Sequence, residues 1–317
     1  MEQIAMRKSF LTAIVMSIAG VLSGGVCSFF GYDDCIELKN SHTRVVIAAY
    51  GGRLLEYSLN GRNILYLDNA QAGWNFSDGG KKIAPSGGRF DIGPEITIPR
   101  HPLLWEKKWQ LHEISNTTAI AVSQPDPFTG VQLTRIFELS ENDSRLSVTQ
   151  IMTNISSTPV QWNFWGRILT VPGGVCIIPR EGISRYPAGY YSYHRGTLLM
   201  RPQDKAVEIT GKYAAIHPFP VDPKLSFDSL SGKLHYFSPN DLLLTITYPI
   251  FPERRYNNES GMTACVFYCR DFCELEPIGP NEEVLPGGKN SFTIILELKD
   301  QTFPGAKKIL GEYTQNL

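Results

Sequence analysis

The sequence predicts an all-β fold, a large antiparallel sandwich that forms one domain, and three observations support this prediction. First, apolar and polar residues alternate with a period of two through much of the chain, as in strands that bury one face. Second, the 28 glycines and 21 prolines among 317 residues provide many turns, which suits short strands better than long helices. Third, 42% of the residues are hydrophobic and 19% are charged, so the chain can bury a full core and is not intrinsically disordered.

The first strand signals surround a hairpin. Aliphatic runs lie at 44–47, 54–59 and 63–67, and the pair Asn60 and Gly61 separates the last two runs. An Asn-Gly pair between two such runs is the strongest short hairpin signal. Further strands are predicted at 109–115, 118–123, 131–139, 145–153, 160–170, 233–237, 242–248, 262–276 and 291–298, and one helix at 305–313.

The middle of the chain, residues 186–223, is rich in proline and could be mistaken for a linker. Its aromatic residues, among them Tyr190, Tyr191, Tyr193, Tyr213 and Phe219, are too numerous for a solvated tether. Long aromatic loops on a β scaffold are often binding loops. We therefore expect a single domain without a linker.

Residues 1–28 have the form of a secretory signal. Arg7 and Lys8 come first, an apolar run follows at 10–18, and small residues end the segment. This pattern predicts a leader at 1–28, a sandwich domain at 29–317, and export to the periplasm or the extracellular space. Membrane contact is then expected only through a retained leader or a lipid on Cys27. Val26 stands where a lipid-attachment signal has Gly or Ala, which disfavours a lipoprotein.

The charge and the cysteines restrict the class of protein. With 30 Lys and Arg against 31 Asp and Glu, the net charge of −1 excludes a global attraction to nucleic acid. An even number of six cysteines allows disulfides in an exported protein, with Cys176 or Cys35 as candidate partners. The spacing of Cys265, Cys269 and Cys273 places all three on one face of the predicted strand at 262–276.

Three segments carry candidate site residues. The segment 74–109 contains Arg89, His101 and Trp105, and its prolines and glycines predict an irregular, site-like loop. A surface loop that closes the sandwich is the alternative. The segment 161–167 alternates aromatic with amide and guanidinium side chains, including Trp165 and Arg167. A pyranose has an apolar C–H face and a rim of hydroxyls, so this pattern suits sugar binding, with core packing as the alternative.

The third segment is Cys-Glu-Leu-Glu-Pro at 273–277. Alternation places Glu274 and Glu276 on the same face of a strand. Two carboxylates that share a face near apolar residues raise at least one pKa, which suits a general base. A polar outer edge is the alternative. Phosphate-loop, nucleophile-elbow and His-Glu-x-x-His metal motifs are absent from the sequence.

Several of these segments, in this order, resemble the galactose mutarotase-like (aldose 1-epimerase) superfamily. The matching pieces are GGRLLEYSLNGRNILYLD at 51–68, GGRF at 87–90, His101 ahead of Trp105, the strands at 133–162, and CELEPIGPNEEVLPGG at 273–288. The resemblance spans about residues 36–298, and it is closest to an uncharacterised bacterial branch. It implies a β-supersandwich with a saccharide site on the concave face of its large sheet.

The resemblance also implies residue roles. Glu276 matches the glutamate that takes the proton from the anomeric hydroxyl, with Glu274 as its rival, and Arg89 matches an arginine that binds sugar hydroxyls. His101 lies near a substrate-positioning histidine and is the provisional acid. The histidine that active members carry after the turn at 154–158 is missing here, where the chain reads Trp-Asn-Phe-Trp-Gly-Arg.

Three hypotheses follow. The first is an exported aldose 1-epimerase or hexose epimerase that needs neither metal nor organic cofactor, because acid–base ring opening uses none. The second is a non-catalytic saccharide-binding protein with Trp105 and Trp165 as platforms. The third is a structural envelope protein without a ligand, in which Arg89, Glu276 and His101 do not converge. A phosphosugar would require basic residues such as Lys81, Lys82 and Arg100 at the mouth of the site.

Overall fold

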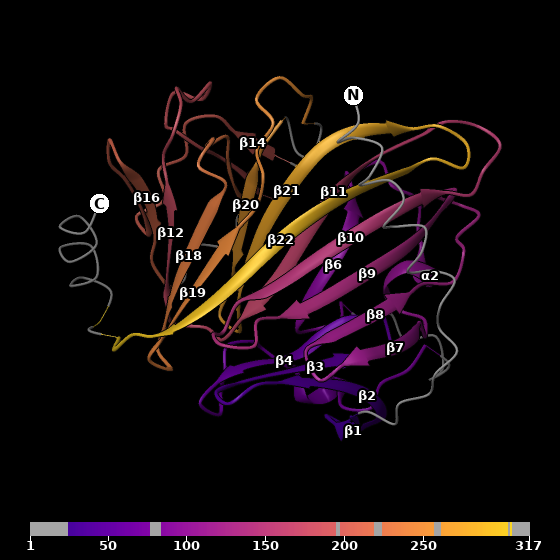
Figure 1. Cartoon of the computed structure of the whole chain (residues 1–317). Coiled ribbons are helices and arrows are strands. Elements are labelled where there is room, and N and C mark those ends of the chain that lie inside the picture. The colour runs from indigo at the N-terminus through magenta and orange to yellow at the C-terminus, as the bar shows by residue number, and fades with distance from the viewer. Residues whose placement is uncertain are drawn as a thin grey trace, which may run out of the picture.

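Two antiparallel sheets contain nearly all the regular structure of the chain (Figure 1). The computed structural model describes residues 25–76, 84–194, 197–218, 224–256, 261–303 and 305. The large sheet has 12 strands and the second sheet has 10 strands among these residues. The predicted all-β sandwich is therefore confirmed.

The large sheet follows, in spatial order, β1 (Val26–Phe29), β2 (Tyr32–Lys39), β3 (Thr43–Ala48), β4 (Arg53–Leu59), β6 (Gly88–Gly93), β11 (Val160–Thr170), β21 (Cys273–Val284), β20 (Ala264–Tyr268), β17 (Lys224–Phe227), β13 (Tyr191–His194) and β14 (Thr197–Leu199). The short strand β5 (Arg62–Asn63) pairs with β4. The second sheet follows β15 (Val207–Ile209), β16 (Tyr213–Ile216), β12 (Val175–Pro179), β18 (Lys233–Ser238), β19 (Leu242–Thr247), β22 (Lys289–Asp300), β10 (Leu146–Asn154), β9 (Val131–Leu139), β8 (Thr118–Val122) and β7 (Gln110–Ser115). Two short helical turns are described, the 3-10 turn η1 (Asn69–Gln71) and α2 (Pro102–Trp105).

The core lies between the two sheets. Strands β9 and β10 alternate between buried and more exposed residues, as expected for strands with one face in the core. Across the interface, the ring centroids of Phe164 on β11 and Phe292 on β22 are 5.7 Å apart, and those of Phe90 and Phe137 are 6.3 Å apart. Figure 1 shows β10 and β22 in front of β6 and β11.

The middle of the large sheet is buried on both faces. The first nine residues of β21 are all buried, although successive side chains point to opposite faces. Leu275 packs in the core, so its neighbours Glu274 and Glu276 lie on the face that points away from the second sheet. This second buried face is where a site can form.

Arg135 of β9 connects the second sheet to the large sheet. Its guanidinium is buried and donates hydrogen bonds to the carbonyl oxygens of Gly51, Gly52 and Phe90. It also lies over the Trp109 ring, 4.2 Å from the ring centroid. The bond to Phe90 holds the backbone of β6 beside the preceding residue of that strand, Arg89.

Two predictions about regular structure are wrong. The segment 74–109 is not wholly irregular, because β6 is a central strand and α2 a short helix within it. Along β6, Phe90 and Ile92 pack in the core, while Arg89 and Asp91 point to the opposite face. The predicted strand at 262–276 is two strands, β20 and β21. The exposed residues Arg270 and Asp271 occupy the turn between them, and Cys269 N–H donates to the Phe272 carbonyl at 3.0 Å.

This hairpin changes the position of the three cysteines. Cys265 faces the cluster of Trp165 and Tyr191, Cys273 packs in the main core, and Cys269 lies in the turn. They do not share one face, because the chain reverses between them. All six cysteines are free thiols in the structure.

Other predicted elements fit to different degrees. The run at 63–67 contacts β4 through β5 and through Ile64, whose N–H donates to the Tyr57 carbonyl at 3.1 Å. Further along this run, Leu65 forms a bridge with Thr170, and Tyr66 N–H donates to the Leu169 carbonyl at 2.9 Å. The proline-rich middle at 186–223 contains the short strands β13 to β16. The predicted helix at 305–313 lies outside the described residues apart from Gly305. The predicted leader boundary after residue 28 falls within β1.

Among the helices of the described residues, none combines the length and the apolar character needed to cross a membrane.

Candidate functional site

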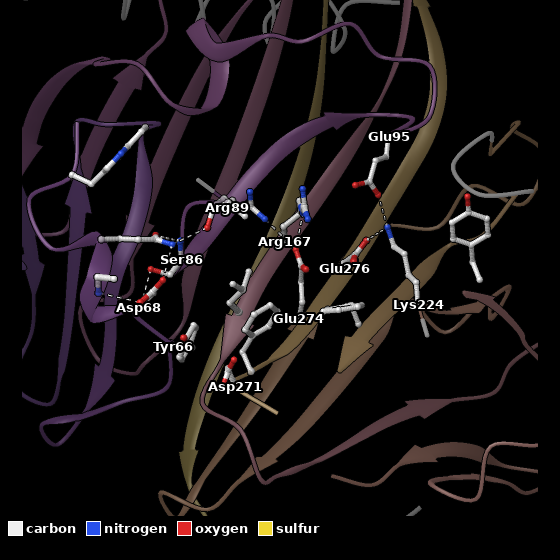
Figure 2. A pocket seen from close by; sticks show the side chains of 18 residues that line it. Tyr66, Asp68, Ser86, Arg89, Glu95, Arg167, Lys224, Asp271, Glu274 and Glu276 are labelled. Atoms are coloured by element: carbon white, nitrogen blue, oxygen red, sulfur yellow. Dashed lines mark hydrogen bonds and ion pairs between the residues drawn. The ribbon is translucent and has the colours of Figure 1, made fainter. Parts of the chain in front are cut away.

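A cavity of about 700 Å³ lies on the outer face of the large sheet (Figure 2). Six neighbouring strands, β6, β11, β21, β20, β17 and β13, each contribute at least one lining side chain. The lining residues that carry charge are Asp68, Arg89, Glu95, Arg167, Lys224, Asp271, Glu274 and Glu276, and the aromatic ones are Tyr66, Trp74, Tyr193, Phe267 and Phe272.

The register of the strands sets the floor of the cavity. Glu274 lies opposite Phe267, Phe267 lies opposite Lys224, and Lys224 lies opposite Tyr193. These four residues form one row across β21, β20, β17 and β13. Because cross-strand neighbours point to the same face, residues that are far apart in the sequence converge on one site.

Glu274 is held by two arginines from β6 and β11. Arg167 Nε donates to Glu274 Oε1 at 2.6 Å, and Arg89 Nη2 lies 3.3 Å from the same oxygen. Burial by itself raises the pKa of Glu274, but the charges of Arg167 and Arg89 outweigh it, so the pKa falls below its ordinary value. Glu274 is therefore an ionised group that orients the two guanidinium groups.

The two arginines differ in their surroundings. Burial and the nearby charge of Arg167 lower the pKa of Arg89 to about 10. Within the described part of the chain, Arg89 Nε and Nη1 make no hydrogen bond. The Arg89 guanidinium lies over the Trp105 ring at 5.2 Å, and the Arg167 guanidinium lies over the Trp165 ring at 4.1 Å. Both indoles thus support an arginine that lines the cavity.

Glu276 lies two residues after Glu274 on β21, on the same face of the strand, and its exposed fraction is 1%. Its Oε2 atom accepts a hydrogen bond from Trp165 Nε1 at 2.6 Å and lies 3.1 Å from Lys224 Nζ. Lys224 Nζ also lies 3.0 Å from Glu95 Oε2 and 4.6 Å from the Trp165 ring centroid. Figure 2 shows Lys224 between Glu95 and Glu276 at one end of the cavity.

His101 is buried beside the site rather than in its lining. Its Nε2 lies 2.9 Å from Asp91 Oδ1, and its Nδ1 lies 2.7 Å from the Pro99 carbonyl oxygen. Burial lowers the pKa of His101, but the charge and hydrogen bond of Asp91 raise it to about 9. Both ring nitrogens are therefore occupied as donors in a charged imidazolium.

The seven predicted site residues divide into two groups. Four of them line the cavity, namely Arg89, Arg167, Glu274 and Glu276. The other three, His101, Trp105 and Trp165, lie behind the lining. Trp165 donates a hydrogen bond to Glu276, and Trp105 stacks under Arg89. The ring centroid of His101 is 6.0 Å from that of Trp105. The catalytic and binding roles of all seven stay predictions.

The sequence does not indicate Lys224 as a site residue, nor the aromatic part of the lining that Tyr66, Phe267 and Phe272 form. Tyr66 and Phe272 stack with ring centroids 5.4 Å apart, and Phe267 lies 5.9 Å from Phe272. The only signal for Lys224 was a charged residue that alternates with apolar ones in Lys-Leu-Ser-Phe, at 224–227. Alternation gives the face of a residue but not the strand beside it.

The described lining carries five carboxylates, those of Asp68, Glu95, Asp271, Glu274 and Glu276, and three cations, those of Arg89, Arg167 and Lys224. Of the basic residues predicted for a phosphosugar, Arg100 is half exposed, pairs with Glu106 and does not line the cavity. Lys81 and Lys82 lie outside the described residues. In the same described part of the chain, no group of three or more His, Cys, Asp or Glu is placed to hold a metal ion.

Comparison with known proteins identifies the fold. No family model matches the sequence, and no curated protein matches it. Among solved structures, a galactose mutarotase-like protein from Lactobacillus casei has a TM-score of 0.54 at 15% identity, over 84% of this chain and 100% of that one. A galactose mutarotase-like protein from Clostridium acetobutylicum has a TM-score of 0.56 at 10% identity, over 87% and 98% of the two chains. At these identities the likeness concerns the fold, and it confirms the resemblance seen in the sequence at that level. This chain has the fold of the galactose mutarotase-like superfamily.

Proposed function

We propose that this protein binds a neutral aldose, free or at the reducing end of a short saccharide, and catalyses the exchange of its anomers. The observation that carries the proposal is the position of Glu276. Its carboxylate is buried in the cavity lining and oriented by the Trp165 indole at 2.6 Å. A fixed carboxylate in the lining of a cavity suits a general base that removes a hydroxyl proton.

The surrounding groups support a sugar as the ligand. Arg89, Arg167 and Glu274 form a cluster of donors and acceptors along one wall, which suits the hydroxyl rim of a pyranose. The aromatic faces of Tyr66, Phe267 and Phe272 form another part of the lining, which suits its C–H face. Pockets that combine apolar surface with a few convergent polar groups are typical binding sites.

The balance of charge favours a neutral ligand. Five carboxylates face three cations among the described lining residues. A phosphate or a uronate would meet this negative excess at close range, where like charges repel strongly. The proposal therefore names neutral aldoses and excludes hexose phosphates as preferred ligands.

The test is NMR spectroscopy of the purified protein with a panel of free aldoses and short oligosaccharides. Saturation transfer reports binding, and exchange between the two anomeric resonances reports catalysis. We expect both signals in the wild type, and we expect Glu276→Gln to retain binding while anomer exchange falls to the uncatalysed rate. Glu138→Gln is the matched control, because Glu138 is exposed on β9, in the second sheet.

A second candidate function is saccharide binding without catalysis. It is favoured by the state of His101, whose two ring nitrogens are both engaged. Saturation transfer without faster exchange in the wild type would support this candidate and contradict a mutarotase. The third hypothesis, a structural protein, requires that Arg89, Glu276 and His101 do not converge. Arg89 and Glu276 line one cavity, whereas His101 lies outside its lining. The absence of saturation transfer with every sugar would support this hypothesis.

We also propose that the protein is exported through the leader in residues 1–28. The supporting pattern is the basic start, the apolar run and the small residues that follow it. Mass spectrometry of the protein from cell fractions tests this proposal. A mature form that lacks the leader, found outside the cytoplasm, is expected, whereas a full-length cytoplasmic protein would contradict export.

A further inference from the structure

We propose that Lys224 donates the proton to the ring oxygen of the bound sugar and so replaces the missing acid histidine. This inference rests on the proposed function, because it assigns a second catalytic group in the same site. It concerns a residue that sequence reasoning did not select.

The position of Lys224 is set by strand register. It begins β17, opposite Phe267 on one side and Tyr193 on the other. All three side chains line the cavity. The exposed fraction of Lys224 is 9%, so its side chain is a buried part of the cavity lining rather than a mobile surface group.

The surroundings of Lys224 favour the charged, proton-carrying form. Its Nζ atom lies 3.0 Å from Glu95 Oε2 and 3.1 Å from Glu276 Oε2. It also lies 4.6 Å from the Trp165 ring centroid, and the face of an indole attracts a cation. A proton is therefore available at Nζ when the sugar binds.

The distance between Lys224 and Glu276 matches the chemistry of ring opening. The anomeric hydroxyl and the ring oxygen are bonded to the same carbon, so the base and the acid must be close neighbours. Glu276 Oε2 and Lys224 Nζ are 3.1 Å apart and both line the cavity. If the two side chains move slightly apart, the anomeric hydroxyl can contact Glu276 while the ring oxygen contacts Lys224.

The other proton carriers of the site are less suited to this role. Arg89 and Arg167 are paired with Glu274, whereas Lys224 is paired with the proposed base, Glu276. The two ring nitrogens of His101 are engaged by Asp91 and Pro99, and His101 is outside the lining. A lysine can give up a proton and take it back.

The step balances in protons and electrons. Glu276 removes the proton of the anomeric hydroxyl, and the electron pair of that O–H bond forms the aldehyde C=O bond. The bond between the anomeric carbon and the ring oxygen breaks, and its electron pair takes the proton of Lys224. Rotation of the aldehyde and the reverse transfers close the ring in the other anomer, which returns both protons to their first positions without another reactant.

Two substitutions of Lys224 test the inference. In Lys224→Met, we expect anomer exchange to fall at least about 100-fold, since general acid catalysis contributes about 10²–10⁴-fold. Lys224→Arg keeps a positive charge near Glu95 and Glu276 but does not release its proton readily, so we expect a similar loss. Saturation transfer from the sugar should persist in both variants, and thermal unfolding should show that both are folded.

The pH profile supplies a readout that a purely structural role would not change. In the wild type, kcat/KM for anomer exchange should fall at alkaline pH as Lys224 loses its proton. This alkaline limb should be absent from the residual activity of Lys224→Met. Glu138→Gln, which changes an exposed residue on β9 in the second sheet, is the control and should keep the limb.

The outcomes separate this inference from the proposed function. Exchange at the wild-type rate in Lys224→Met would overturn the role of Lys224 and leave the mutarotase intact. A full rate in Lys224→Arg would also overturn it, because a charge alone would then suffice. No saturation transfer in the wild type would instead contradict the proposed function itself.

Discussion

The indole N–H of Trp165 donates a hydrogen bond of 2.6 Å to Oε2 of Glu276, and the two residues come from the neighbouring strands β11 and β21. Trp165 is 3% exposed, so it holds this carboxylate from behind the cavity rather than presenting its face to a ligand. The geometry gives the tryptophan a positioning role that its aromatic character alone did not indicate.

Replacing Trp165 by Phe should therefore slow anomer exchange more than it weakens binding. The ring is kept, but Glu276 loses the donor that orients it, and a small misplacement of a catalytic group can cost about 100-fold in rate. We expect a loss of about 10- to 100-fold in kcat with a nearly unchanged KM, measured by NMR exchange kinetics. A selective rise in KM would contradict this role and favour a stacking platform.

Glu274→Gln should destabilise the protein strongly. The exposed fractions of the Arg89 and Glu274 side chains are 5% and 6%, so the substitution leaves buried guanidinium groups without their carboxylate. Removing one partner of a buried ion pair costs about 3–5 kcal/mol. Urea unfolding monitored by tryptophan fluorescence measures the change, with Glu138→Gln as the control. An unchanged midpoint would mean that the two arginines find other partners.

The Asp91 and His101 pair should make stability depend on pH. The charge of Asp91 overcomes the effect of burial and raises the pKa of His101 to about 9, above the ordinary value of about 6.5. The stability that this pair contributes is present below pH ~6.5 and is lost as the pH rises towards ~9. We expect the free energy of unfolding to fall over this window by on the order of 3 kcal/mol.

Asp91→Asn isolates this effect. The carboxamide cannot hold the imidazolium charge, so the pKa of His101 should return towards or below its ordinary value. Urea unfolding at a series of pH values should then show a much smaller slope between pH ~6.5 and ~9. The same slope in the variant and the wild type would assign the pH dependence to other groups.

Hexose phosphates should bind less well than the corresponding hexoses. The described lining has five carboxylates and three cations, so an added phosphate is repelled. We expect at least about a tenfold weaker affinity for the phosphorylated sugar, measured by isothermal titration calorimetry at low ionic strength. Tighter binding of the phosphate would indicate that basic residues such as Lys81 and Lys82 contribute to the site.

The start of the folded domain should lie before β1. Val26–Phe29 pairs with β2, and Cys27 lies opposite Cys35 in this ladder. A protein that starts at residue 29 lacks most of β1 and should be less stable than one that starts at residue 25, by about 1 kcal/mol for the lost strand hydrogen bonds. Thermal unfolding of the two forms compares them directly. Equal stability would show that β1 adds nothing and that cleavage after residue 28 is harmless.

Much of the fold could be predicted because alternation is a local property. The runs that form β8, β9, β10 and β19 carry their buried face in their own spacing. β6 could not be predicted in this way. It is buried on both faces and rich in glycine, so it shows neither alternation nor strand propensity, and its position depends on Arg135 and on the strands beside it.

The site was predicted in the same partial way. The same-face placement of Glu274 and Glu276 follows from a spacing of two, and the resemblance of the short motifs at 87–90 and 273–288 points to Arg89 and Glu276 from the sequence alone. The sequence favours His101 as a site residue because it stands in a segment crowded with other candidates. Its hydrogen bond with Asp91 depends on how the chain returns from β6 to α2.

The class of fold, the face of each regular strand and the two carboxylates of the site can be predicted from the sequence, because they depend on residues that are close along the chain. Three relations arise only when the chain is folded: Lys224 lies 3.1 Å from Glu276, Trp165 supports Glu276, and Asp91 holds His101. These relations depend on the order and register of strands from distant parts of the chain. That order is set by the packing of the whole sheet, which no local pattern encodes.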